Sequence, residues 1–356
     1  MKSRQQICKG YSLIELLISM SIGVVLIGII IVSYVVQNQV YKVTNSQAAT
    51  QNAANAISAL VTPLVRSVGF VGCSTTSQGL TISLNAGSPP PLGAAISPGM
   101  LVGYDASGTA GSGLLTLTTR NPANDTVLLN WSPILDPSLA SLVQTGSDVL
   151  ALLGPVPNSQ PTAVTQVTAA STSLTVNASS GLVVGQLVAI SDCSKSTIFN
   201  VTGISGNEIY HLSGAGPTAN TVSTFPVNYL SPQLIPLQQS ALYVAQGQGG
   251  QSALMRAVYK NNAWAALPLV PGVQTMQVLY GIGANGEITQ YVPANAVTSW
   301  TSVYCLKLAF LIEGQPGSGG ANTPTSFKLL GTTVNVPQDG RMRRVYELTI
   351  DLRNAS

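Results

Sequence analysis

The sequence contains little charge. Only 8% of its 356 residues are Asp, Glu, Lys or Arg, whereas an average soluble domain has about 25%. Three of the 15 basic residues lie among the first ten positions, so the rest of the chain balances 12 basic residues against 12 acidic ones. This balance excludes a chain kept disordered by net charge and a basic nucleic-acid-binding domain. No direct nucleic-acid site is expected.

Histidine is nearly absent as well. His211 is the only one, which excludes His-rich metal sites and paired-His metalloprotease motifs. It lies in an apolar run without a G-x-S-x-G elbow elsewhere, so we expect a structural role. Gly281 and Gly286 satisfy G-x-G-x-x-G, but Asn285-Gly286 leads into a strand-like segment and favours a β-hairpin. We expect no catalytic residues, no metal site and no cofactor, and therefore no enzyme.

What the sequence does have is a long apolar run close to its first residue. Residues 1–10, MKSRQQICKG, carry three basic groups and no acid, and residues 11–36 contain a single charged group, Glu15. As a helix, residues 11–36 extend roughly 39 Å, more than the ~30 Å hydrocarbon core of a bilayer. The basic residues before the run place the first ten residues in the cytoplasm and the rest of the chain outside.

Three interpretations compete for this segment. A cleavable secretory signal would have a shorter apolar region that ends in an A-x-A-like site, and residues 20–36 contain none. A plain signal anchor fits the length but leaves Glu15 unexplained, since an acid in an apolar span is costly. The third interpretation is a resemblance: residues 9–16, KGYSLIEL, resemble the processing site of type IV prepilins, with a basic leader ending in Gly, an aromatic residue, and a Glu four positions later.

The resemblance implies specific roles for three residues. Prepilin peptidase cuts after Gly10 and methylates the new amine on Tyr11, which stands where the family usually has Phe. In a filament the Glu15 carboxylate then lies in an apolar helix bundle, where an unpaired charge is expensive. The ammonium of Tyr11 in a neighbouring subunit offsets that cost and sets the axial register of the subunits.

Helical patterning continues beyond the apolar run. Within residues 37–68 an apolar stripe consists of Ile57, Leu60, Val61, Leu64, Val65 and Val68. Pro63 lies inside the pattern, so we expect a kink or a restart there, and Gly69 is expected to end the helix. This stripe is predicted to pack on the domain that follows.

The remaining residues, 69–356, predict a β-rich domain. Residues 74–113 are rich in Ser, Thr, Gly and Pro and are expected to form long loops with one short strand. Runs of strand length recur from residue 114 onward, and in residues 304–312 alternate positions are apolar. The sequence thus predicts an α+β protein: a leader (1–10), a membrane-spanning helix (11–36), its amphipathic continuation (37–68), and an elaborate, mostly antiparallel β domain (69–356).

Further resemblances narrow the family to the PilW-type minor pilins. They lie at the helix exit VRSVGFVGC (65–73), in residues 190–202 around Ser-Asp-Cys, in VQTMQVLYG (273–281), and in the closing segment 343–354. Residues 74–186 match nothing in that family and are interpreted as loop insertions. Val32 stands where major pilins often have Pro, which agrees with a minor pilin.

Four cysteines allow a single bridge in an oxidising compartment. Cys8 leaves with the leader, so the remaining residues permit Cys73–Cys193, Cys73–Cys305 or Cys193–Cys305. The family resemblance favours Cys73–Cys193, because that family has cysteines at both places. Cys305 is then expected to be a half-buried free thiol.

The last sixteen residues carry a basic cluster of Arg341, Arg343, Arg344 and Arg353. One interpretation is an edge strand protected by charge. The other is a contact surface for an acidic patch on a partner pilin.

The resemblance implies a minor pilin that takes part in type IV pilus assembly, in a priming complex or at the pilus tip. The implied partners are other minor pilins, the major pilin, prepilin peptidase, the inner-membrane assembly platform, a tip adhesin and inner-membrane lipid. The implied location is the inner membrane, crossed once with a periplasmic C-terminal domain, and then the filament or its tip at the cell surface. Two alternatives remain: a pseudopilin of a type II secretion system, and a membrane-anchored periplasmic binding module.

Overall fold

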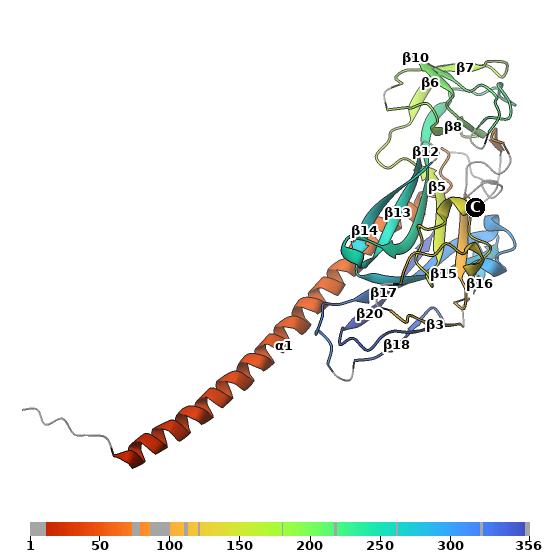
Figure 1. Ribbon diagram of the computed structural model, residues 1–356. Coiled ribbons are helices and arrows are strands. Elements are labelled where there is room, and N and C mark those ends of the chain that lie inside the picture. The colour runs from red at the N-terminus through yellow and green to blue at the C-terminus, as the bar shows by residue number, and fades with distance from the viewer. Residues whose placement is uncertain are drawn as a thin grey trace, which may run out of the picture.

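The computed structural model describes residues 12–72, 79–85, 100–109, 113–119, 122–179, 181–216, 219–260, 263–320 and 323–352. In this part of the chain one long helix projects from a β domain (Figure 1). The predicted α+β class, with a long apolar N-terminal helix and a large, mostly antiparallel β domain, is confirmed.

Helix α1 (Leu13–Arg66) is 54 residues long and ends where the sequence predicts. It runs through Pro63 without a restart, because Pro63 stands in the last turn and its missing donor removes a single hydrogen bond. Ser67 caps the helix, and the turn that follows contains Gly69 with φ at 73°. The Gly69 amide then donates to Leu153 O at 3.0 Å, which joins the helix exit to the β domain.

The largest sheet has 13 strands among the described residues. They are β1 (Leu80–Ile82), β2 (Leu101–Ala106), β4 (Trp131–Ser132), β5 (Val149–Pro155), β6 (Thr162–Gln166), β7 (Ser173–Val176), β8 (Leu187–Ser191), β9 (Ser196–Asn200), β10 (Gly203–Ser205), β11 (Glu208–Tyr210), β12 (Gln233–Gln246), β13 (Ser252–Lys260) and β14 (Ala263–Pro271).

A second sheet has the order β16-β15-β17-β20, and a small third sheet has the order β18-β19-β3. Their strands are β15 (Val273–Ala284), β16 (Glu287–Val292), β17 (Val303–Glu313), β20 (Arg343–Asp351), β18 (Ser326–Leu329), β19 (Thr332–Asn335) and β3 (Leu114–Thr116). Short 3-10 helices are η2 (Leu128–Asn130), η3 (Pro137–Leu139), η4 (Gln248–Gly250), η5 (Ala294–Ala296) and η6 (Trp300–Ser302).

Strand β12 divides the largest sheet into two parts. Residues 237–242 pair with β5 and residues 240–246 with β13, whereas residues 233–236 pair with β8 and residues 233–234 with β6 as well. The main core, which also includes residues of α1, contains Ile235 and the apolar residues of the longer part, whereas Leu234 belongs to a separate apolar core. The strands of the second core form the lobe farthest from the free end of α1 (Figure 1).

The second core contains the single histidine. His211 is buried, and its ring lies 4.0 Å from the ring of Phe225 and 5.3 Å from that of Phe199, measured between centroids. Burial among apolar rings lowers the pKa of His211 to about 4. The imidazole is therefore neutral at physiological pH and fills space in the core.

Residues 74–186 contribute more than surface loops. They supply β2 and the first five residues of β5, all of which are buried, and β5 pairs with both β12 and β2. Sequence patterning predicts the β5 strand and one short strand without a position in residues 74–113, where the structure has both β1 and β2. The short apolar run at 101–106 is interrupted by Gly103 and Asp105, which obscures β2.

Two buried aspartates, Asp105 and Asp148, join the two larger sheets. Asp148 Oδ1 accepts from Ala106 N at 2.9 Å and Thr109 Oγ1 at 3.2 Å, while Oδ2 accepts from Val278 N of β15 at 2.8 Å. Asp105 Oδ2 accepts from Asn295 N at 3.1 Å. Burial raises the pKa of Asp105 to about 6, against the lowering effect of its backbone hydrogen bonds, and burial raises the pKa of Asp148 well above its usual range.

We predict that Asp105→Asn stabilises the β domain at pH 7. Between pH 4 and 6 the folded state holds a proton on Asp105 that the unfolded state releases, so the unfolding free energy falls as pH rises through this range. An amide at position 105 cannot ionise, and it keeps an acceptor for Asn295 N. Relative to its own value at pH 3, the variant should exceed the wild type at pH 7 by on the order of 2 kcal/mol.

Urea unfolding of the full chain in detergent, followed by tryptophan fluorescence, measures this difference. A matched control is Asp192→Asn. Burial would raise the pKa of Asp192, but donors at Leu230, Ser194 and Lys195 lower it to about 2. That variant should lose stability at pH 7 and approach the wild type as the pH falls toward 2. Equal pH slopes for wild type and Asp105→Asn would show that Asp105 titrates normally.

Candidate functional site

The described chain begins at the first turn of α1, where Ser12 and Glu15 form a capping box. Ile14 N donates to Ser12 Oγ at 3.4 Å, and Ser12 N donates to Glu15 Oε2 at 3.0 Å. This second role for Glu15 escaped the sequence analysis, although Ser12-x-x-Glu15 is a capping-box signature. Gly10 and Tyr11 lie outside the described residues.

The first part of α1 makes no contact with the β domain. Residues 13–36 project away from it, and the most apolar window of α1 has a mean hydropathy of 2.8 with none of its residues buried (Figure 1). Ser19 Oγ and Ser21 Oγ donate back to the carbonyls of Leu16 and Ile18, at 2.9 and 2.8 Å. These hydroxyls therefore bring no unsatisfied donor into an apolar environment. By length and composition, this helix can cross a membrane.

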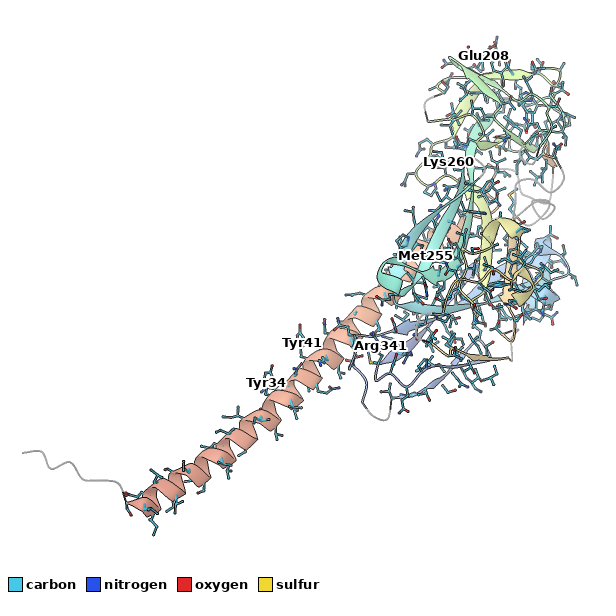
Figure 2. The ribbon with its side chains drawn as sticks, viewed as in Figure 1. Tyr34, Tyr41, Glu208, Met255, Lys260 and Arg341 are labelled. Atoms are coloured by element: carbon cyan, nitrogen blue, oxygen red, sulfur yellow. The ribbon has the colours of Figure 1, made fainter. Side chains whose placement is uncertain are left out.

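Two tyrosines lie near the end of the apolar run. Tyr34 and Tyr41 are 67% and 69% exposed and point away from the helix axis (Figure 2). The apolar run ends at Val36, and Gln37, Asn38 and Gln39 follow. Tyrosine has an apolar ring and a polar tip, which suits the boundary between membrane and water.

The second part of α1 packs on the β domain through one face. Its buried residues recur every three or four positions and are Ser46, Thr50, Ala54, Ile57, Val61 and Val65. Of the predicted stripe, Ile57, Val61, Val65 and Val68 are buried, whereas Leu60 remains 44% exposed. The packed face therefore begins with small polar residues, which a search for apolar periodicity does not detect.

Ser46 of α1 lies directly against Gly314 and Gln315 of the β domain. Its hydroxyl accepts from Gln315 N at 3.0 Å, and the Cβ of any residue other than glycine at position 314 would lie 1.9 Å from Ser46 Oγ. Nearby, Gln39 Nε2 donates to Gly317 O at 3.2 Å and Asn45 Nδ2 to Gln315 Oε1 at 3.3 Å. Gly314 thus lets the helix meet the end of β17 directly.

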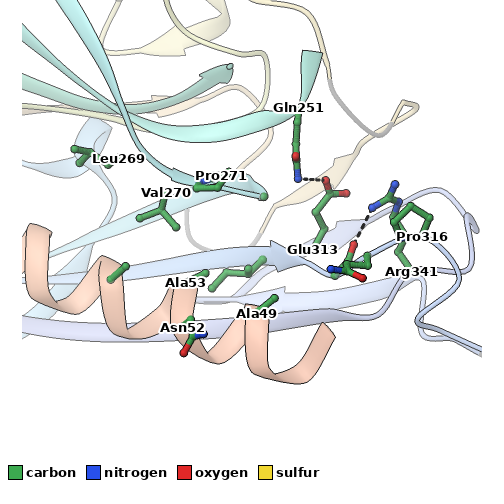
Figure 3. Close-up of a pocket in the computed structure, with 15 residues that line it drawn as sticks. Ala49, Asn52, Ala53, Gln251, Leu269, Val270, Pro271, Glu313, Pro316 and Arg341 are labelled. Atoms are coloured by element: carbon green, nitrogen blue, oxygen red, sulfur yellow. Dashed lines mark hydrogen bonds between the residues drawn. The ribbon is translucent and has the colours of Figure 1, made fainter. Parts of the chain in front are cut away.

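A cavity of about 660 Å³ lies beside this contact, between α1, β14 and the end of β17 (Figure 3). Its walls include Ala49, Ala53, Leu269, Ile312, Glu313 and Arg341. Glu313 accepts from Gln251 Nε2 at 3.1 Å and Gln274 Nε2 at 3.3 Å, and Arg341 Nη1 donates to Gly314 O at 2.8 Å. The charged groups at this end of the cavity therefore bind neighbouring residues of the chain.

Of the three C-terminal arginines in the described part of the chain, two are buried and one is exposed. Arg341 and Arg343 are only 9% and 7% exposed. Arg343 makes a bidentate contact to Asp339, at 2.9 and 2.8 Å, and its Nε donates to Gln274 Oε1 at 2.7 Å. Arg344 is exposed and donates to Gln51 Oε1 of α1, at 2.5 Å. Arg353 lies outside the described residues, so partner contact stays a prediction for Arg344 and Arg353.

Strand β20, which carries Arg343 and Arg344, is the outer strand of its sheet. This agrees with an edge strand. Its charges, however, serve mainly to join the strand to Asp339 and to α1 rather than to solvate it.

Among the cysteines, Cys305 is free and buried. It is more deeply buried than predicted, and the hydroxyl of Tyr291 lies 3.8 Å from its sulfur. The helix exit lies against the loop that carries Cys193: a Cβ at Gly72 would lie 2.6 Å from Ser191 Oγ. Cys73 is outside the described residues, so its bond to Cys193 stays a prediction.

The glycine motif at 281–286 is a hairpin, as predicted. Strands β15 and β16 are antiparallel, and Ala284 pairs with Glu287. Asn285 and Gly286 between them both have positive φ, 55° and 79°, as in a type I′ turn. No cluster of three His, Cys, Asp or Glu side chains suited to a metal occurs among the described residues.

Two segments of the chain match known families. Residues 6–31 match the prokaryotic N-terminal methylation motif, and residues 241–354 match the family described as type IV pilus-assembly protein W. The second match runs from the middle of β12 past the end of β20, so it excludes the resemblances at 65–73 and 190–202. No curated protein and no solved structure matches the chain.

Both matched families belong to pilus assembly and not to a known class of enzyme. The methylation motif covers the start of the exposed apolar helix, and the PilW segment includes β14, β17 and β20, the strands that its second part contacts. Together, the two matches and this fold support the assignment of the chain as a PilW-type pilin.

Proposed function

We propose that this minor pilin takes part in type IV pilus assembly as a non-enzymatic subunit, in a priming complex or at the pilus tip. The observation that carries the proposal is the apolar first part of α1, which leaves large hydrophobic side chains exposed from Leu13 to Val36. So much apolar surface requires a membrane or other helices around it. Before assembly the membrane surrounds this apolar surface, and in the filament core the helices of other subunits surround it.

Glu15 is the proposed register residue within that core. In the single chain its Oε2 accepts from Ser12 N, so the carboxylate is held at the first turn of the helix. The methylated amine of Tyr11 in an adjacent subunit would pair with this carboxylate and offset the cost of burying it. Gly23 and Gly28 have no atoms near their missing Cβ positions, which leaves room for a neighbouring helix to approach closely.

The proposed partners follow from the two stages of this life cycle. Prepilin peptidase acts at Gly10 and Tyr11 while α1 is in the inner membrane, with the β domain in the periplasm. Other minor pilins, the major pilin and the assembly platform then contact the helix and the sides of the domain, with a tip adhesin beyond them. Families of pilus-assembly proteins imply contact with other pilus components, which supports this proposal.

The proposed bridge between Cys73 and Cys193 would fasten the helix exit to the loop after β8. Gly72 and Ser191 are in contact, so the two cysteines are one and two residues from a point where the chains touch. Because Cys305 is buried and free, it does not compete for either partner. The bridge would close a loop of about 120 residues, for which chain-entropy estimates approach ~5 kcal/mol.

N-terminal peptide mapping by mass spectrometry tests the function. Sheared surface filaments and inner membranes are analysed separately, and a peptide that begins at N-methylated Tyr11 is expected in both. Its restriction to the membrane would indicate a pseudopilin or a subunit that only primes assembly. Residues 1–10 still attached in both fractions would contradict the prepilin assignment and indicate a plain membrane anchor.

We predict that Glu15→Gln is processed normally but enters filaments at least about tenfold less than the wild type. Glutamine keeps the capping box, because its side-chain oxygen still accepts from Ser12 N, but it removes the charge that pairs with Tyr11. Immunoblots of sheared filaments and membranes give the ratio. Glu208→Gln, an exposed carboxylate in the distal lobe, is the matched control and should behave as wild type. Unreduced incorporation of Glu15→Gln would remove the register role.

Non-reducing peptide mapping of the periplasmic protein should recover Cys73 linked to Cys193 and an unmodified Cys305. Serine at position 193 should lower the urea midpoint of the domain, whereas serine at 305 should not abolish the bridge. A peptide that links Cys73 to Cys305 would overturn the pairing.

A further inference from the structure

A second cavity, of about 470 Å³, lies where α1 ends. One wall is the last turns of α1, with Leu60, Pro63 and Leu64, and the opposite wall is the loop after β5. Pro155 at the end of β5, Val156, Pro157 and Pro161 of the loop, Ile235 of β12 and Phe70 make the lining mostly apolar. Its polar members are Ser67, Asn158 and Ser159 beside Arg256. Its volume falls in the range of small-ligand sites.

One cation, Arg256 of β13, lines this apolar cavity. The guanidinium Nε and Nη2 both donate to Ser240 Oγ, at 3.3 and 3.1 Å. None of the ion pairs found in the described part of the chain includes Arg256. Partial burial lowers its pKa, which agrees with a guanidinium that has lost part of its water and pairs with no carboxylate among the described residues.

The end of α1 does not compensate this charge by direct contact. The hydrogen bonds of Arg256 go to Ser240 and not to the last carbonyls of the helix, although a helix C-terminus carries a partial negative charge. By contrast, the buried Arg343 has a carboxylate in bidentate contact. Among the described residues, Arg256 is thus a half-buried cation beside a mostly apolar cavity, with the neutral hydroxyl of Ser240 as its hydrogen-bond partner.

We propose that this cavity binds a peptide segment of a partner protein, in which a carboxylate flanked by apolar side chains pairs with Arg256. A carboxylate matches the forked guanidinium geometry and supplies the missing charge. Leu60 and Phe70 leave 44% and 36% of their surfaces exposed, so the apolar surface continues beyond the cavity. It can therefore receive the residues on either side of the carboxylate, which a small free acid would lack. The proposal does not depend on where in a filament the protein acts.

Binding is measured with the full chain in phospholipid nanodiscs, which avoid free detergent, and with three probes. Acetyl-leucyl-glutamyl-leucinamide carries the carboxylate between apolar residues, its glutaminyl analogue lacks the charge, and hexanoate is a free apolar acid. By titration calorimetry or NMR, the glutamyl peptide should bind about tenfold more tightly than the glutaminyl peptide. The preference should disappear below about pH 4, where the peptide carboxyl is protonated.

Arg256→Gln should abolish the preference for the glutamyl peptide, while Arg66→Gln, an exposed arginine in the last turn of α1, should retain it. Equal binding of glutamyl and glutaminyl peptides, absence of binding by both, or an unchanged preference in Arg256→Gln would overturn the proposal. Hexanoate that binds as tightly as the glutamyl peptide would replace the peptide with a free acid.

Urea unfolding of the two variants separates binding from folding. If Arg256 serves a ligand, the unliganded Arg256→Gln protein should unfold at the same urea concentration as the wild type or a higher one, since it loses an uncompensated charge. A lower midpoint of Arg256→Gln, together with an unchanged preference of that variant for the glutamyl peptide, would show that Arg256 stabilises the fold instead.

Discussion

The rest of the structure depends on the packing of one face of α1 against the β domain. A helix that did not contact the β domain would have no fixed orientation relative to it. In α1, the face from Ser46 to Val65 packs against β14, β17 and β20 and sets this orientation. Small side chains at the start of that face allow close approach, and larger aliphatic ones fill the core toward the end. Because the helix is continuous, fixing its second part also fixes the direction in which the apolar first part leaves the domain.

Strands of both larger sheets of the β domain contact α1. The largest sheet ends at β14, and the second sheet presents β17 and β20, so α1 lies where the edges of two sheets meet. Asp148 joins the same two sheets from within, because its carboxylate accepts from the backbone of both. Burying an ionised carboxylate is costly, and hydrogen bonds from several backbone donors offset part of that cost.

Sequence patterns predicted those parts of the protein that rest on a single period or a local turn. The apolar run, the helix end near Gly69, the hairpin at Asn285-Gly286 and the alternation of Leu306, Leu308 and Phe310 in β17 all follow from residues close together in the chain. The docking of Ser46 against Gly314 did not, because 268 positions separate the two residues and neither is apolar. The burial of Arg343 did not follow either, because its partner Gln274 lies 69 positions away, whereas its second partner, Asp339, is only four residues distant. The capping role of Glu15 is visible in the Ser12-x-x-Glu15 pattern. The sequence interpretation instead explained this acid, which is costly in an apolar run, by its pairing in a filament.

Strand β12 gives the domain a mechanical hierarchy. Its long C-terminal part pairs with β5 over residues 237–242 and with β13 over residues 240–246, whereas its first four residues pair with β6 and β8 of the distal lobe. Tension along this strand loads its backbone hydrogen bonds in shear, so bonds in the long part must break together and those in the short part fail first. A pull on the distal lobe would thus unfold that lobe, while the main core and its packing against α1 stayed intact. The distal lobe can therefore absorb a mechanical load by unfolding before the membrane-spanning helix loses its contact with the domain.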